Sequence, residues 1–116
     1  MRVLLTGASS FSGYWFAAKL HAAGFDVVAP LRGAVSAYAG VRGERVRKLA
    51  AVTTVVPDCP FGSSRFMDLL SNECFDVLCH HAARVTDYRS LDFDVVQALA
   101  ENTNNIRKII EAMLKP

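Results

Sequence analysis

Short apolar runs alternate with segments of helical periodicity along the whole chain. The apolar runs predict four strands, at residues 2–6, 26–31, 53–56 and 75–80. Val3, Leu4 and Leu5 are consecutive apolar residues, as expected for a strand that is covered on both faces of a parallel sheet. Strands that alternate with helices predict an α/β fold with a parallel sheet.

The predicted helices lie at residues 12–23, at residues 44–51, from a cap at Ser63 or Ser64 to residue 71, and at residues 92–114. The first has apolar positions at helical spacing, namely Trp15, Phe16, Leu20 and Ala23. The last is predicted as one long helix with an apolar stripe of Val95, Val96, Leu99, Ile106, Ile109, Ile110 and Met113. Residues 33–43 are expected to form a mobile loop, and residues 84–91 a polar loop that lines a substrate pocket.

The stretch VLLTGASSFSG, residues 3–13, joins the first strand to the first helix. Gly7 allows a sharp turn that brings backbone N–H groups toward an anion, and Gly13 opens the helix without a side chain. This arrangement is typical of the phosphate-binding turn of a dinucleotide-binding βαβ unit. Ser9 and Ser10 belong to the same turn, and Ser10 stands where the fingerprint has its middle glycine.

The end of the second strand bears on the choice of cofactor. Proteins that bind NAD have an Asp or Glu here, which accepts hydrogen bonds from the ribose hydroxyls. This chain has Arg32 instead, and Asp26 lies at the opposite end of the strand. A guanidinium can hold a 2′-phosphate, so we expect NADP, with NAD as the alternative. The other interpretation of Arg32 is a surface loop arginine.

Further candidates follow the later strands. Asp58 stands at the carboxyl end of the third strand, where adenine would lie, although an Asx turn is an equally good interpretation. The small residues Ala82 and Ala83 follow the fourth strand and leave room for a ligand. Asn102 falls inside the last predicted helix, where it either bonds to backbone near the fourth strand or belongs to an exposed polar patch.

Composition excludes several classes of protein. The chain has 116 residues, of which 52% are hydrophobic, so we expect a single domain over residues 1–116 with a core of its own. Its formal net charge of +2 is too small to indicate nucleic acid, and the basic run at residues 42–48 is interpreted as a solvated helix face. No signal peptide is recognised, and no apolar run has the length needed to span a membrane.

Cysteine and histidine usage gives two further expectations. Cys59, Cys74 and Cys79 are odd in number and form no CxxC pair, which favours reduced thiols in a cytoplasmic protein. Cys79, His80 and His81 are adjacent, but neighbouring residues on a strand point to opposite faces. We therefore predict structural or pocket-lining roles for them and no metal site.

These stretches together resemble the extended short-chain dehydrogenase/reductase family, including its NAD-dependent epimerase/dehydratase group. Residues 6–13 are similar to the family's TGxxGFxG loop, and Ser12 replaces a usual aliphatic residue. Residues 75–83 are similar to its FDVVxHxAA strand, and residues 102–112 to a helix in which Asn102 and Glu111-Ala112 match. The resemblance implies a Rossmann-like three-layer αβα fold, a partial doubly wound parallel sheet in strand order 3-2-1-4.

The family's chemistry uses a Tyr-x-x-x-Lys pair, and this chain has none, because Tyr14, Tyr38 and Tyr88 are followed four residues on by other residue types. The resemblance therefore implies the amino-terminal, cofactor-binding part of a reductase, epimerase or dehydratase that acts on a nucleotide-sugar or another carbinol. The alternatives are a non-catalytic dinucleotide-binding sensor or scaffold and a dimerisation module, with a homodimer formed through the last helix. The predicted cofactor-binding residues are Gly7, Ser9, Ser10, Phe11, Gly13, Arg32, Asp58, Cys59, His81, Ala82, Ala83 and Asn102.

Overall fold

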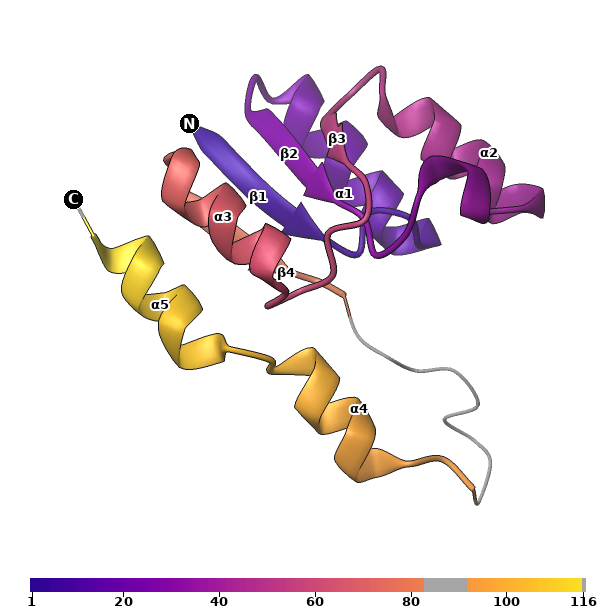
Figure 1. The fold of residues 1–116 in the computed structure, drawn as a ribbon. Helices are drawn as coiled ribbons and strands as arrows, with labels where there is room; N and C mark the ends of the chain where they lie inside the picture. The colour runs from indigo at the N-terminus through magenta and orange to yellow at the C-terminus, as the bar shows by residue number, and fades with distance from the viewer. Residues whose placement is uncertain (83–91, 116) are drawn as a thin grey trace.

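The computed structural model describes residues 1–82 and 92–115, which form a parallel sheet flanked by helices (Figure 1). The strands are β1 (Arg2–Thr6), β2 (Asp26–Pro30), β3 (Thr54–Val56) and β4 (Val77–His80). Their order is β3-β2-β1-β4, and each neighbouring pair is parallel. This order is that of the first four strands of a doubly wound sheet, so the predicted Rossmann-like fold is confirmed.

The helices cover both faces of this sheet. One face carries α1 (Phe11–Ala22) and α2 (Gly40–Leu49), and the other carries α3 (Ser64–Asn72) and α5 (Ile106–Leu114) (Figure 1). A short 3₁₀ turn, η1 (Val35–Ala37), precedes α2. The remaining helix, α4 (Val95–Asn102), extends below the sheet in Figure 1. The polar loop predicted at residues 84–91 lies outside the described residues.

The core has two halves because successive strand residues point to opposite faces. Leu5 packs with Ala17 of α1 and Leu49 of α2, whereas its neighbour Leu4 packs with Phe66 of α3 and Ile109 of α5. All six side chains are fully buried. The consecutive apolar residues of β1 are thus required on both faces, as predicted.

The start of α3 follows the sequence prediction closely. The Ser63 hydroxyl accepts a hydrogen bond from the Phe66 N–H at 3.2 Å, which satisfies an otherwise unpaired donor in the first turn. The helix then buries Phe66, Leu69 and Leu70 against the sheet. Cap and apolar face are both encoded locally, which explains why the sequence alone locates this helix.

The single long helix predicted at residues 92–114 is wrong, because the chain breaks between α4 and α5. Asn105 adopts a left-handed conformation with φ of 57°, and its side-chain amide donates to the Gly62 carbonyl at 2.7 Å. Asparagine tolerates this conformation better than most residues. The hydroxyl of Thr103 also donates to the Leu99 carbonyl at 2.7 Å, in the last turn of α4. The break separates the predicted apolar stripe: Ile109 is buried, but Val95, Val96, Leu99 and Ile110 are exposed.

The predicted apolar face of the first helix is also wrong in part. Trp15 and Phe16 are 52% and 38% exposed, whereas the buried positions of α1 are Gly13 and Ala17. Small residues face the sheet because α1, which begins at the glycine turn, packs closely against the sheet. Hydrophobic spacing alone cannot show this, since both sets of positions recur with helical period.

The second helix begins earlier than predicted. Residues 33–43 were expected to be a loop, but they contain η1 and the first residues of α2, which starts at Gly40 rather than at Glu44. Gly43 is buried, and a Cβ placed there would lie 2.6 Å from the Tyr38 carbonyl oxygen. The glycine therefore serves close packing within a helix rather than a mobile loop.

The amino-terminal edge of the sheet is closed by a group that we call the Arg2 cluster, defined as Arg2, Asp26, Glu73, Phe75 and Asp76. The guanidinium pairs with Asp26 at 2.9 Å and with Glu73 at 2.7 Å, and lies 5.0 Å from the Phe75 ring centroid. The Arg2 backbone N–H donates to the Asp76 carboxylate at 2.8 Å. These contacts join β1, β2 and the segment that enters β4.

Candidate functional site

A cleft of about 840 Å³ opens at the opposite edge, where the carboxyl ends of β1, β2 and β4 meet. In open α/β sheets, ligands bind in the crevice outside these strand ends. The lining comes from the glycine turn (residues 7–13), the segments after β2 and β4, and the corner between α4 and α5. The cleft is large enough for an extended organic ligand.

Two glycines make the turn possible. Gly7 has a φ of +75°, and a Cβ placed there would lie 2.7 Å from the backbone nitrogen of Ala82. A Cβ on Gly13 would collide with the Gly7 carbonyl oxygen. Any side chain at either position would therefore force the turn away from β4 or from its own helix. The two glycines hold the start of α1 against the end of β1.

Ser10, at the position of the missing fingerprint glycine, forms the amino-terminal cap of α1. Its hydroxyl accepts from the Gly13 N–H at 3.0 Å and donates to the Gly7 carbonyl at 2.9 Å. The N–H groups of Phe11 and Ser12, the first two helical residues, have no carbonyl partner within the helix. They remain available, at the positive end of the helix dipole, to an anion.

Two arginines of α2 contact this turn, which the sequence interpretation of a solvated basic face missed. Arg42 Nε donates to the Ser9 hydroxyl at 3.2 Å, and Arg45 Nε donates to the Ser9 carbonyl at 3.1 Å. The two side chains are three residues apart and so share one face of the helix. Spacing alone does not single them out, because Arg45 and Lys48 are also three residues apart, so only the structure shows which basic side chains contact the turn.

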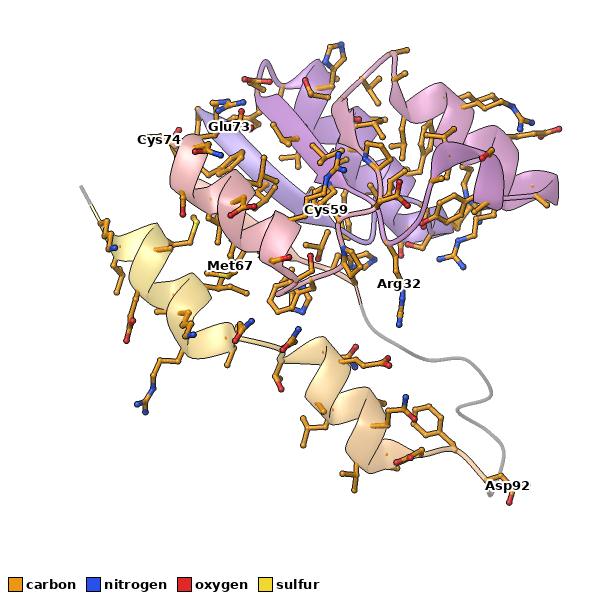
Figure 2. The ribbon with its side chains drawn as sticks, viewed as in Figure 1. Arg32, Cys59, Met67, Glu73, Cys74 and Asp92 are labelled. Atoms are coloured by element: carbon orange, nitrogen blue, oxygen red, sulfur yellow. The ribbon has the colours of Figure 1, made fainter. Side chains whose placement is uncertain are left out.

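Arg32 extends from the end of β2 toward α4 (Figure 2). Its guanidinium is 3.4 Å from the carboxylate of Glu101, which lies near the end of α4 and lines the same cleft. The Arg32 side chain is 65% exposed and that of Glu101 is 29% exposed. A cation at the end of β2 was predicted, but its acidic partner from α4 was not.

His80 lies within a continuous chain of hydrogen bonds at the end of β4. Nδ1 lies 2.8 Å from the Thr6 hydroxyl, and Nε2 lies 2.8 Å from the Asn102 carbonyl oxygen. A carbonyl only accepts, so the network assigns the ring proton to Nε2. The Thr6 hydroxyl donates to Nδ1 and accepts from the Ala82 N–H at 3.0 Å. The Phe61 ring stacks on the imidazole with centroids 3.8 Å apart.

His81 points to a different set of partners. Its Nε2 is 2.8 Å from the Ser12 hydroxyl, and its ring meets Phe16 edge-on with centroids 5.1 Å apart. The pair joins α1 to the segment after β4 at the rim of the cleft. Over residues 1–82 and 92–115, no group of three His, Cys, Asp or Glu side chains could hold a metal ion.

Cys59 lies beside the cleft but is only 2% exposed. Burial raises the pKa of the Cys59 thiol above its ordinary value, and the charge of Arg65 opposes this only in part. The sulfur is thus held as a neutral thiol at neutral pH, which suits packing and does not suit a nucleophile. Its role in the cleft is to form part of the wall.

Many of the predicted cofactor-binding residues line this cleft, namely Gly7, Ser9, Ser10, Arg32, Cys59, His81, Ala82 and Asn102. Phe11 is 78% exposed, and Asp58 is exposed with a φ of 52°, and neither belongs to the lining. Gly13 is buried behind the turn, and Ala83 lies outside the described residues. Lining residues that the sequence analysis did not select include Thr6, Ser12, Tyr38, Arg42, Phe61, His80 and Glu101.

Asn102 reaches the end of β4 in an unexpected way. The sequence left open whether Asn102 bonds to backbone near the fourth strand or belongs to an exposed polar patch. In the structure the backbone carbonyl of Asn102 accepts from His80, and the amide side chain of Asn105 donates to Gly62. The two contacts hold the corner between α4 and α5 over the cleft.

No protein-family model and no curated protein matches this chain. Among solved structures it is similar to a protein described as a betaketoacyl-ACP reductase, with a TM-score of 0.59 and 21% identity. It is also similar to the bulky-bulky ketone specific alcohol dehydrogenase from Comamonas testosteroni, with a TM-score of 0.59 and 17% identity. Each comparison covers 97% of this chain.

These similarities establish the fold. The chain spans 45% of the length of the first structure and 49% of that of the second, so it is similar to less than half of either. No helix in residues 1–82 and 92–115 is long and apolar enough to cross a bilayer. From the similarities to the two solved structures, the chain has the Rossmann-like fold found in this reductase and this dehydrogenase.

Proposed function

We propose that this chain binds NADP as the cofactor-binding part of an oxidoreductase similar to the short-chain dehydrogenases/reductases. The observation that carries this proposal is one cleft bounded by a glycine turn and by arginines from two other segments. A turn that ends at a helix N-terminus suits a diphosphate, and guanidinium groups suit a further phosphate monoester. The fold alone would not support this function, because one fold hosts many functions.

The residues present fit such a cofactor. Gly7 and Gly13 allow the turn to pack closely against the end of β4 and against its own helix, because a Cβ at either position would crowd backbone atoms. Within the proposal, the amide of Ser12, which lines the cleft at the start of α1, holds the diphosphate, while Ala82 leaves space beside it. When bound, the cofactor supplies hydride transfer, and the residues named here bind and orient it.

The preference for NADP over NAD rests on charge. The end of β2 carries Arg32 where an NAD-binding protein has an acidic residue, and Arg42 and Arg45 approach from α2. A 2′-phosphate carries about −1.5 to −2 charges at neutral pH and gains strongly from such groups. A ribose hydroxyl gains little from them.

The reaction of a longer parent protein is the broader part of the proposal. The sequence resemblance favours a reductase, epimerase or dehydratase of the extended group, acting on a nucleotide-sugar or another carbinol. The similar solved structures are named as a reductase and an alcohol dehydrogenase, which favours oxidoreduction. A cytoplasmic location is supported by the three unpaired cysteines.

Calorimetric titration with NADPH and NADH tests the proposal. We expect NADPH to bind more tightly than NADH. We also expect Arg42→Gln to weaken the binding of NADPH by roughly tenfold, as for the loss of a charged hydrogen bond. The matched control is Arg107→Gln, which removes the same charge from an exposed position on α5. Absence of heat with both cofactors would exclude dinucleotide binding, and tighter binding of NADH would exclude the role of the arginines.

A second candidate function, self-association without catalysis, is favoured by exposed apolar side chains. Val95, Val96 and Leu99 of α4 and Leu114 of α5 are more than half exposed, and β4 is an edge strand. Sedimentation of the wild type and of Leu99→Glu tests this function. A homodimer should dissociate in the variant, whereas a wild type that stays monomeric at high concentration contradicts the candidate.

A further inference from the structure

The ion pair between Arg32 and Glu101 joins two segments that are 69 residues apart in the sequence. Its two side chains both line the cleft, at the corner where β2 ends. Figure 2 shows Arg32 directed from the sheet toward α4. The cation proposed to hold a 2′-phosphate thus already contacts an anionic group of the chain itself.

We propose that Glu101 competes with the 2′-phosphate of the dinucleotide for Arg32 and thereby limits the preference of the cleft for NADP over NAD. This inference rests on the proposed function and adds a specificity-determining residue to it. A carboxylate and a phosphate present the same kind of acceptor oxygens to the planar guanidinium fork. Only a ligand with an anion at this position can replace Glu101 on Arg32.

The burial of the two partners supports an exchange of this kind. Arg32 is the more exposed partner and can turn to a ligand without leaving a buried site. Glu101 is less exposed, and its carboxylate also accepts from the Gln97 side chain at 3.3 Å, one turn earlier on α4. The acid therefore keeps a partner on its own helix when the arginine turns away.

The charge of the ligand decides which cofactor's affinity depends on Glu101. NADP must displace a carboxylate of one negative charge, and its 2′-phosphate succeeds because it carries about −1.5 to −2 charges. NAD has a neutral hydroxyl at this position, so it leaves the pair intact and gains nothing from Arg32. Removing the charge of Glu101 should therefore tighten the binding of NADP and leave the binding of NAD unchanged.

The test is calorimetric titration of the wild type and of Glu101→Gln with NADPH and with NADH at low ionic strength. An exposed ion pair is worth only a fraction of a kcal/mol to about 1 kcal/mol, so we expect NADPH to bind about two- to fivefold more tightly to the variant. NADH affinity should not change. Glu111→Gln makes the same charge change on an exposed residue of α5 and should affect neither cofactor.

A double-mutant cycle shows whether the effect passes through Arg32. In the Arg32→Met background, Glu101→Gln should have no effect on NADPH binding. An effect that persists in that background would overturn the competition. Weaker NADH binding by Glu101→Gln would also overturn it, because Glu101 would then be accepting from the ribose hydroxyls.

The outcomes also separate this inference from the proposed function. Tight NADPH binding by the wild type, with no change in Glu101→Gln, would overturn the competition and leave the proposed function in place. No binding of either cofactor by any variant would overturn both. Far-ultraviolet circular dichroism of each variant confirms that the fold is retained, since neither side chain belongs to the core.

Discussion

The two edges of the sheet carry similar charged groups arranged for opposite purposes. At the amino-terminal edge, Arg2 contacts Asp26 and Glu73, and the Arg2 amide contacts Asp76. At the carboxyl-terminal edge, three arginines surround a glycine turn and an open cleft. The first edge pairs its cation with two acids of neighbouring segments, whereas at the second edge Arg32 and Arg42 line an open cleft, although each also contacts a group of the chain.

Strand direction explains the difference. In a parallel sheet, each helix begins where a strand has just ended, so the positive ends of helix dipoles gather at the carboxyl edge. The amino edge receives the ends of helices, and there an ion-pair cluster joins neighbouring strands. The comparison predicts that changes at the amino edge alter stability and leave binding unchanged, whereas changes at the carboxyl edge alter binding.

The largest effect is expected from Gly13→Val. Its side chain would collide with the Gly7 carbonyl and push α1 from β1, so we expect no measurable NADPH binding and a stability loss of about 1–3 kcal/mol. The control is Gly33→Ala, whose new Cβ would meet only Ala37 Cβ at 3.7 Å. Calorimetry and urea unfolding give both quantities. Wild-type affinity in a folded Gly13→Val protein would remove the glycine turn from the binding site.

The opposite pattern is expected from Arg2→Met at the amino edge. The variant loses two partly exposed ion pairs and a contact with the Phe75 ring, so stability should fall by about 1–2 kcal/mol. NADPH affinity should not change, and Arg107→Met on α5 should change neither quantity. A loss of NADPH binding without a loss of stability would contradict the separation of the two edges.

Thiol chemistry should also distinguish the edges. Cys74 is exposed near the Arg2 cluster, and Cys59 is buried beside the cleft, so a thiol reagent should label Cys74 first. Because burial raises the pKa of Cys59, its contribution to stability is present below the ordinary thiol pKa and is lost as pH rises from that value through the raised pKa of the folded state. Urea unfolding between pH 7 and about pH 10 should show a steeper fall for the wild type than for Cys59→Ala. Equal slopes would show that burial does not hold this thiol neutral.

The smallest effect is expected from Ser10→Gly, which restores the glycine of the fingerprint. Replacement of a serine cap by glycine costs only a few tenths of a kcal/mol, and removal of the Cβ should bring the diphosphate closer. We therefore expect slightly lower stability and tighter NADPH binding. Weaker binding in a stable variant would show that the Ser10 hydroxyl itself helps to hold the ligand.

Much of the fold was predictable because its signals are local. Consecutive apolar residues located the strands, and Ser63 with Phe66, Leu69 and Leu70 located α3. The break at Asn105 was not predictable from apolar spacing, because it depends on a contact with Gly62, which is 43 residues away. The exposure of Trp15 likewise depends on how closely α1 approaches the sheet.

The candidate site likewise has one part that was predictable from the sequence and one part that was not. Gly7, Ser10 and Arg32 were found from position relative to a strand, since the carboxyl ends of parallel strands meet at one edge. Arg42 was assigned to a solvated face, because sequence spacing shows which residues share a helix face but not what that face contacts. The role of Asp58 toward adenine stays a prediction.

Hydrophobic pattern and glycine spacing by themselves predicted the strands, the glycine turn and the edge of the sheet at which a ligand would bind, because these signals lie within a few residues of one another. The strand order was implied by the family resemblance. Only the tertiary structure decided which charges meet at that edge. Glu101 reaches Arg32 because the chain turns at Asn105 and His80 holds the Asn102 carbonyl. Contacts between distant segments depend on packing, which no local pattern encodes.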